Sequence, residues 1–134
     1  MWHVLEHVAD LDATILKLKD KLHEDGTLIV AVPNHESDDG KYYRENWAGF
    51  DVPRHLWHFN RKSMNMLVEK NKMRIADVMP MKLDAFYISM LSEKYKKPDA
   101  GLNGLIRAAI NGLRSNARAG DTGNYSSLIY IIKK

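Results

Sequence analysis

Hydrophobic residues follow first a helical and then a strand-like pattern at the start of the chain. Between residues 10 and 22 apolar side chains recur at steps of three and four, which predicts an amphipathic helix capped by Asp10. These side chains are Leu11, Ile15, Leu18 and Leu22. Residues 27–32 then form an unbroken apolar run rich in β-branched side chains, which is typical of a strand buried on both faces. A helix that leads into such a strand is half of a βαβ unit.

The segment from residue 35 to residue 60 keeps no period and is rich in aromatic side chains. It follows the carboxyl end of the predicted strand, where open α/β sheets place their ligands. A connection of this length is uncommon unless it lines a pocket or forms a lid. Asn60 is then placed to cap a helix running to about Lys70, and residues 73–81 suit a strand at a sheet edge.

Two more helices and a strand are predicted in the last third of the chain. One helix runs from Asp84 to about Tyr95, and a second contains a regular apolar stripe between residues 102 and 113. We expect a loop at residues 119–123 and a buried strand at 127–132. The alternation of helices and strands predicts an α/β fold.

Composition limits the class of protein. With 134 residues, 45% hydrophobic, the chain fits one globular domain. The absence of cysteine excludes disulfides, zinc ribbons and thiol nucleophiles, and favours a cytoplasmic setting. No apolar stretch reaches the length of a membrane helix, and we expect no membrane partner. The net charge of +3 is too small to indicate nucleic-acid binding.

The N-terminal segment His3-Val4-Leu5-Glu6-His7 matches the H-x-x-E-H pattern of some zinc peptidases. Two imidazoles one helical turn apart could bind a metal while the carboxylate activates water. However, Asp10 caps a helix that begins after this motif, so we do not expect His3 and His7 to share a helical face. Polar residues at the end of a strand are the simpler interpretation.

A second cluster lies at residues 51–59. Arg54 could clamp a carboxylate or phosphate, and the imidazoles of His55 and His58 titrate near neutrality, which suits proton transfer or metal binding. The simpler interpretation is that Trp57 and Phe59 pack the loop down while the histidines cap helix ends or face solvent.

Three segments together carry a resemblance to a known family. They are Trp-His-Val-Leu-Glu-His-Val at residues 2–8, the strand ending Val-Pro-Asn at 32–34, and Trp-x-Gly-x-Asp-x-Pro-Arg-His-Leu-x-His-Phe at 47–59. In this order and spacing they resemble the class I S-adenosylmethionine (SAM)-dependent methyltransferases, and within them the bacterial branch related to ubiquinone-biosynthesis methyltransferases. The resemblance extends from Met1 to about Lys72, and more weakly to residues 84–93 and 123–128.

The resemblance implies that the chain is the C-terminal part of such a domain, a single domain fragment of residues 1–134. In the family, the Leu-Glu-His segment follows the fourth strand of a Rossmann-like sheet. The Gly-rich cofactor loop and the acidic residue that holds the ribose lie upstream, and no Gly-rich loop follows a strand in this sequence. We therefore expect three main strands at 27–32, 73–81 and 127–132, with the last antiparallel between the other two, and a helical insertion at about 84–118.

The resemblance also implies roles for individual residues. His3, Val4 and Leu5 would border the methionine end of SAM, and the candidate catalytic bases are His3, Glu6, His7, His55 and His58. Candidate residues for binding the methyl acceptor are Asn34, Arg54, Trp57 and Tyr87. The acceptor itself is expected to be a small molecule, and the isolated fragment is expected to be inactive.

A divalent metal is a further option that the resemblance raises. Some relatives carry E-x-x-E-H around a divalent metal, and here Glu6, His7 and His58 could hold one. Because His3 replaces the first Glu, we expect instead that Glu6 and His7 hydrogen-bond the loop containing Arg54.

Two other classes of function stay open at this point. The chain could be a non-enzymatic α/β module that self-associates or binds a partner through an exposed sheet edge. Arg107, Arg114 and Arg118 align along one helix face and could contact nucleic acid, although a basic helix face is usually only solvated.

Overall fold

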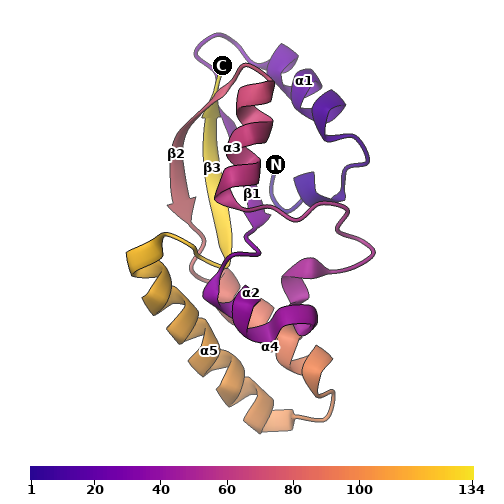
Figure 1. Cartoon of the computed structure of the whole chain (residues 1–134), viewed down its shortest axis with the longest axis vertical. Helices are drawn as coiled ribbons and strands as arrows, with labels where there is room; N and C mark the ends of the chain where they lie inside the picture. The colour runs from indigo at the N-terminus through magenta and orange to yellow at the C-terminus, as the bar shows by residue number, and fades with distance from the viewer.

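The computed structural model describes residues 1–134, which form five α-helices and three β-strands (Figure 1). Along the chain these are α1 (Leu11–Lys21), β1 (Leu28–Pro33), α2 (Asp38–Tyr43), α3 (Arg61–Lys70), β2 (Arg74–Pro80), α4 (Asp84–Lys96), α5 (Gly101–Thr122) and β3 (Ser127–Lys133). Short 3-10 turns lie at η1 (Leu5–His7), η2 (Arg44–Asn46) and η3 (Ala48–Phe50). The predicted α/β fold is confirmed.

The strands form one sheet in the order β1-β3-β2, with β3 antiparallel to both neighbours. The three predicted strands and the central place of the C-terminal one are thus confirmed. β2 lies at an edge and is mostly exposed, as its mixed polarity predicted. Beyond β1, Met1 and His3 each form a backbone hydrogen bond with Ala31, so residues 1–3 continue the sheet in the parallel direction.

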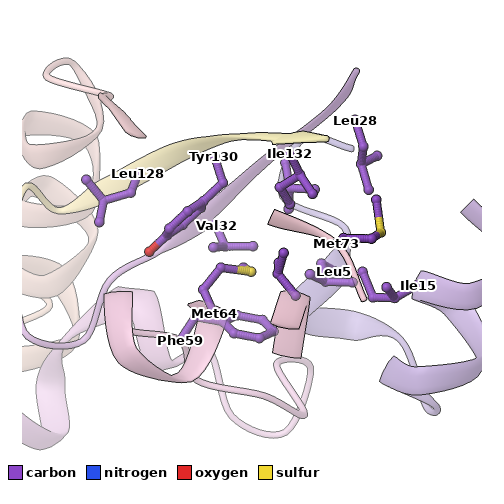
Figure 2. Packing of buried hydrophobic residues seen from close by; sticks show 12 residues of the cluster. Leu5, Ile15, Leu28, Val32, Phe59, Met64, Met73, Leu128, Tyr130 and Ile132 are labelled. Atoms are coloured by element: carbon purple, nitrogen blue, oxygen red, sulfur yellow. The ribbon is translucent and has the colours of Figure 1, made fainter. Parts of the chain in front are cut away.

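The hydrophobic core lies on one face of the sheet, between the strands and the helices α1 and α3. Side chains that alternate along the strands meet there, because neighbours two apart share a face (Figure 2). They include Leu28, Val30, Val32, Leu128, Tyr130 and Ile132, packed against Ile15, Phe59, Met64 and Val68. Burial of Tyr130 also raises the pKa of its phenol to about 12. The core therefore fixes β1, which carries the site at its carboxyl end.

The opposite face of the sheet is less covered. Ile29 in β1 is 44% exposed, and Ile129 and Ile131 in β3 are only partly buried. The expectation that residues 27–32 are buried on both faces is therefore wrong at Ile29. The apolar run predicted the strand correctly, but it contains no information on which helices cover each face of the sheet.

Side-chain caps mark the starts of α1 and α3. The carboxylate of Asp10 accepts from the backbone N–H of Ala13, as predicted for the start of α1. Asn60 and Ser63 form a reciprocal capping box at α3, also at the predicted position. α3 thereby starts directly after the loop that carries His55 and His58.

The three remaining helices, α2, α4 and α5, form a second group past the carboxyl end of β1 (Figure 1). A small apolar cluster of Tyr43, Trp47, Ala48 and Ile88 joins this group to the loop before α3. The buried carboxylate of Asp39 in α2 accepts hydrogen bonds from Trp47, Ser115 and Ser126, at 2.6–2.8 Å. These bonds tie α2, α5 and the start of β3 together.

Two boundaries differ from the sequence predictions. The segment 35–60, expected as a loop, contains α2, whose N-terminus is capped by Ser37. α5 continues through residues 119–122, which were expected in a loop, and ends at Gly123 with φ of +72°. Both segments are short, polar and contain glycine, so their sequences show no helical periodicity. Tertiary contacts stabilise the helix in both places. None of the helices has the length and hydrophobicity required to cross a bilayer.

Candidate active site

A cavity of about 410 Å³ opens at the carboxyl end of β1. The residues before η1 and η1 itself form one wall, the loop after η3 forms a second, and α4 forms the third. Its polar lining consists of His3, His7, Asp51, Arg54, His55 and Asp84. The α4 wall adds Tyr87, Ile88, Leu91 and Tyr95. The cavity therefore combines an ionisable side with an aromatic and aliphatic side.

His3 is held between two carboxylates. Its Nδ1 lies 3.2 Å from Glu6 Oε1, and its Nε2 lies 3.1 Å from Asp84 Oδ2. The hydrogen bond to Asp84, and then that to Glu6, raises the pKa of His3 to about 9. His3 is therefore an imidazolium at neutral pH, with both ring N–H groups donated. Its backbone has a φ of +49°, so the turn into η1 directs the ring at α4.

His7 and His55 are held in the opposite way, by backbone carbonyls. The Nδ1 of His7 lies 3.0 Å from the carbonyl oxygen of Arg54, and the Nδ1 of His55 lies 2.8 Å from that of Gly49. Since a carbonyl only accepts, each Nδ1 carries the proton and each Nε2 is free to accept one. The rings meet edge to face, with centroids 4.6 Å apart.

Burial makes His55 a weak base that is neutral at pH 7. Desolvation lowers the pKa of His55 below its ordinary value, against smaller opposing effects of the Gly49 carbonyl and of Glu6. Its Nε2 lies 4.0 Å from Glu6 Oε1 and 3.8 Å from Asp51 Oδ2. The unprotonated Nε2 of His55 therefore lies near the carboxylates of Glu6 and Asp51. These carboxylates would stabilise the ring once Nε2 is protonated.

Glu6 lies at the centre of this arrangement and is 1% exposed. One carboxylate oxygen binds His3, whereas Oε2 is buried and has no hydrogen-bond partner. Its backbone carbonyl accepts from the N–H groups of Leu56 and Trp57. Together with the His7–Arg54 bond, this confirms the expectation that residues 6 and 7 hydrogen-bond the loop containing Arg54.

Ligand atoms of Glu6, His7 and His55 all lie within 4.8 Å of one another. The carboxylate of Glu6, of which one oxygen has no hydrogen-bond partner, and the two carbonyl-bonded imidazoles suit a divalent cation, because metal-bound histidines usually donate their other ring N–H to such groups. Zn, Mn or Fe would suit this donor set better than Mg, which prefers oxygen ligands. The sequence proposed His58 in place of His55, whereas the group of side chains that lie this close together contains His55 and not His58.

Arg54 reaches the cavity mouth rather than its floor. Its guanidinium donates to Asp51 Oδ1 at 2.6 Å, and this carboxylate raises the pKa of the arginine. Its side chain is 71% exposed. Tyr87, also predicted, is exposed at the same opening.

Several predicted site residues lie outside the cavity. His58 Nε2 bonds the carbonyl of Phe50, 3.0 Å away, and Trp57 Nε1 bonds that of Val8, 2.7 Å away. The amide of Asn34 is buried and donates to the carbonyl of Tyr125. Of the three residues expected to border SAM, only His3 lines the cavity, because Leu5 lies in the core and Val4 faces solvent.

Sequence reasoning missed Asp51, Leu91 and Tyr95 as lining residues. It placed Asp84 only as the start of a helix, whereas the structure brings its carboxylate to His3. One clue was available, because Asp84 and Tyr87 fall in the same weakly matching segment. The contact itself joins residues 81 positions apart, which no local pattern reports.

The topology and the cavity together define an α/β domain with a cavity at the carboxyl end of β1. Residues 1–75 match a family described as a methyltransferase domain, which is more than half of the chain. The chain therefore belongs to this family of methyltransferase domains. No curated protein matches the chain.

Solved methyltransferase structures share the fold at low sequence identity. The match to phosphoethanolamine N-methyltransferase 2 of Haemonchus contortus, in complex with SAM, has a TM-score of 0.50 at 14% identity, and covers 99% of this chain and 32% of that chain. A second complex of this enzyme, with phosphomonomethylethanolamine and S-adenosylhomocysteine, gives a TM-score of 0.52 at 12% identity over the same shares. A mycolic acid cyclopropane synthase complexed with SAH and CTAB gives 0.51 at 11% identity, covering 97% and 52%. The chain thus spans a third to a half of the solved chains and has part of a methyltransferase fold.

Proposed function

We propose that the chain forms the acceptor-binding part of a SAM-dependent methyltransferase and that its cavity binds a small-molecule methyl acceptor. The observation that carries this proposal is the pair of free imidazole Nε2 atoms, on His7 and His55, beside the buried Glu6 in a domain of this family. The sequence motifs at residues 2–8 and 47–59 support the narrower branch related to ubiquinone-biosynthesis methyltransferases.

SAM, when bound, supplies an electrophilic methyl group on a positively charged sulfur. The carboxylates of Asp51 and Asp84 line the cavity and suit a cation, so these residues fit the neighbourhood of the sulfonium. His3 neutralises part of this charge and fixes Glu6 and Asp84 in place. Among residues 1–134 we find no Gly-rich loop after a strand, and we expect the chain alone to bind SAM weakly.

His55 is the residue that we assign as the proton acceptor. A hydroxyl acceptor must lose its proton as it attacks the methyl carbon, and a neutral imidazole with a free nitrogen is suited to take it. Asp51 and Glu6 would then stabilise the imidazolium formed. His3 is less suited to this step, since both of its nitrogens already donate to carboxylates.

The α4 wall indicates the kind of acceptor. Tyr87, Ile88, Leu91 and Tyr95 offer an apolar and aromatic surface across the cavity from the ionisable groups. An acceptor with a hydrophobic or aromatic body and one reactive hydroxyl would satisfy both sides.

The test is methyl transfer from radiolabelled SAM, by the complete gene product, to a panel of hydroxylated aromatic and aliphatic acceptors. His55→Ala should lower kcat by about 10²- to 10⁴-fold while SAM binding stays unchanged. His58→Ala is the matched control, since this histidine lies three residues away and outside the cavity. Full activity in His55→Ala would overturn the assignment of the base. Micromolar SAM binding by the 134-residue chain, measured by calorimetry, would contradict the proposal that the chain supplies only one part of the cofactor site.

A chelator separates proton transfer from metal catalysis. We expect activity to persist in EDTA, because His55 can accept the proton without a metal ion. Loss of activity in EDTA that is restored by added Zn²⁺ or Mn²⁺ would instead assign Glu6, His7 and His55 to a metal centre.

A further inference from the structure

The apolar stripe of α5 faces away from the rest of the molecule. Its side chains are half to three-quarters exposed, with Leu102 at 72%, Ile110 at 58% and Leu113 at 62%. The α5 stripe consists of Leu102, Leu105, Ile106, Ile110 and Leu113, which recur at helical spacing. Figure 1 shows α5 along the outer side of the group below the sheet.

The buried face of α5 is made of small and polar residues instead. Gly104, Ala108 and Gly112 face α4, where a Cβ on Gly112 would lie 2.7 Å from the Phe86 ring. Asn111 and Ser115 hydrogen-bond Tyr43 and Asp39. Since intramolecular packing uses the side without large apolar groups, the α5 stripe is not explained by the core of this chain.

The charge of the chain concentrates around the same stripe. The α4–α5 hairpin, residues 82–122, contains seven Lys and Arg against four Asp and Glu, whereas the rest of the chain contains 13 of each. The whole net charge of +3 therefore lies in this hairpin. Of its four acidic residues, Glu93 is buried and Asp84 binds His3 in the cavity.

Basic side chains flank the stripe on both sides. Lys94 and Lys97 line a pocket together with Leu105, and neither forms an ion pair. Lys82 lies beside Asn116, which donates to its carbonyl. On the other flank, Arg107, Arg114 and Arg118 are half exposed and pair with Glu93 and Asp38.

We propose that the α5 stripe and its basic rim dock on an anionic phospholipid membrane. This proposal departs from the expectation of no membrane partner, which rested on the absence of a spanning helix and not on surface binding. A helix with one apolar face and basic flanks lies in the plane of a bilayer, where its apolar side chains enter the acyl boundary and its cations meet the headgroups. A second copy of the chain is a poorer occupant, because a twofold contact would bring the same basic rims together. No residue of the α5 stripe lines the cavity, so docking of the stripe does not occupy the cavity.

The experiment is co-sedimentation of the chain with vesicles of phosphatidylcholine alone or mixed in equal parts with phosphatidylglycerol. We expect binding to the mixed vesicles, weak binding to phosphatidylcholine, and a loss at high salt. The variant Ile106→Glu with Leu113→Glu should weaken binding by about tenfold or more, since it places charge in the apolar face. The control is Met66→Glu, which changes an equally exposed apolar side chain on α3.

Circular dichroism shows whether each variant stays folded, and the substituted positions are exposed, so folding should be retained. No binding to either vesicle, or equal binding by Ile106→Glu with Leu113→Glu and by the unmodified chain, would overturn the proposal. A dimer in sedimentation velocity that these substitutions dissociate, without vesicle binding, would assign the α5 stripe to a second copy instead.

Discussion

The ion pairs of His3 predict a specific dependence of stability on pH. Because Asp84 and Glu6 raise the pKa of His3 from 6.5 to about 9, the folded state binds its proton more tightly than the unfolded state. This contribution to stability is complete below about pH 6.5 and is lost as pH rises through about 9. The difference in pKa corresponds to at most about 3 kcal/mol. Since the side chain is 30% exposed, we expect solvent screening to reduce it to about 1–2 kcal/mol.

The assay is urea unfolding followed by circular dichroism, at pH 6 and at pH 9.5. His3→Asn is the useful variant, because asparagine tolerates the left-handed backbone at this position but carries no charge. The unmodified chain should lose about 1–2 kcal/mol more than His3→Asn between the two pH values. Other groups that titrate in this range affect both proteins and cancel in the comparison.

His23→Asn is the control, since this exposed histidine makes no side-chain hydrogen bond or ion pair in the structure. It should keep the pH dependence of the unmodified chain. An equal loss of stability in the unmodified chain and in His3→Asn would show that the two ion pairs do not raise the pKa of His3, and would refute the reasoning.

Three substitutions, and Gly120→Ala as a control for the first, test the packing of the fold by chemical denaturation. Gly112→Ala should lower the free energy of unfolding by about 1–3 kcal/mol, because the added Cβ would clash with Phe86. Gly120→Ala, on the open side of α5, should raise the free energy of unfolding by up to about 1 kcal/mol. Equal effects of the two substitutions would contradict the close packing of α4 on α5. Asp39→Ala should cost about 3 kcal/mol or more, since three buried donors lose their acceptor, and a cost below about 1 kcal/mol would mean that water replaces it. Asn60→Ala should cost about 1 kcal/mol through loss of the α3 cap, and an unchanged midpoint would show that the capping box is dispensable.

The α1–β1 unit could be predicted from the sequence because its information is local. An apolar period of three to four, a capping Asp10 and an unbroken β-branched run each depend on neighbours within one turn or one strand. The order of the strands was predicted only through the resemblance to methyltransferases, since β1 and β3 pair across almost 100 residues. The periodicity of apolar residues predicts whether a segment is a helix or a strand, but not which strand it pairs with.

The site divides in the same way. His3, Glu6, His7 and His55 stand in short motifs that the sequence displays, so their chemistry could be proposed. That Glu6 lies near His55 and not His58 depends on η3, where the carbonyl of Gly49 bonds His55 and that of Phe50 bonds His58.

For α5 the sequence determined an amphipathic helix, but only the tertiary structure decided which face is buried. Hydrophobicity alone favours burial of the α5 stripe. In the structure α5 instead buries the face that carries Gly104, Ala108 and Gly112, because only small side chains allow its backbone to approach α4 closely. The same buried face carries Asn111 and Ser115, which hydrogen-bond Tyr43 and Asp39 of α2. The large apolar residues are thereby left outside, where they define a surface that no local pattern could have located.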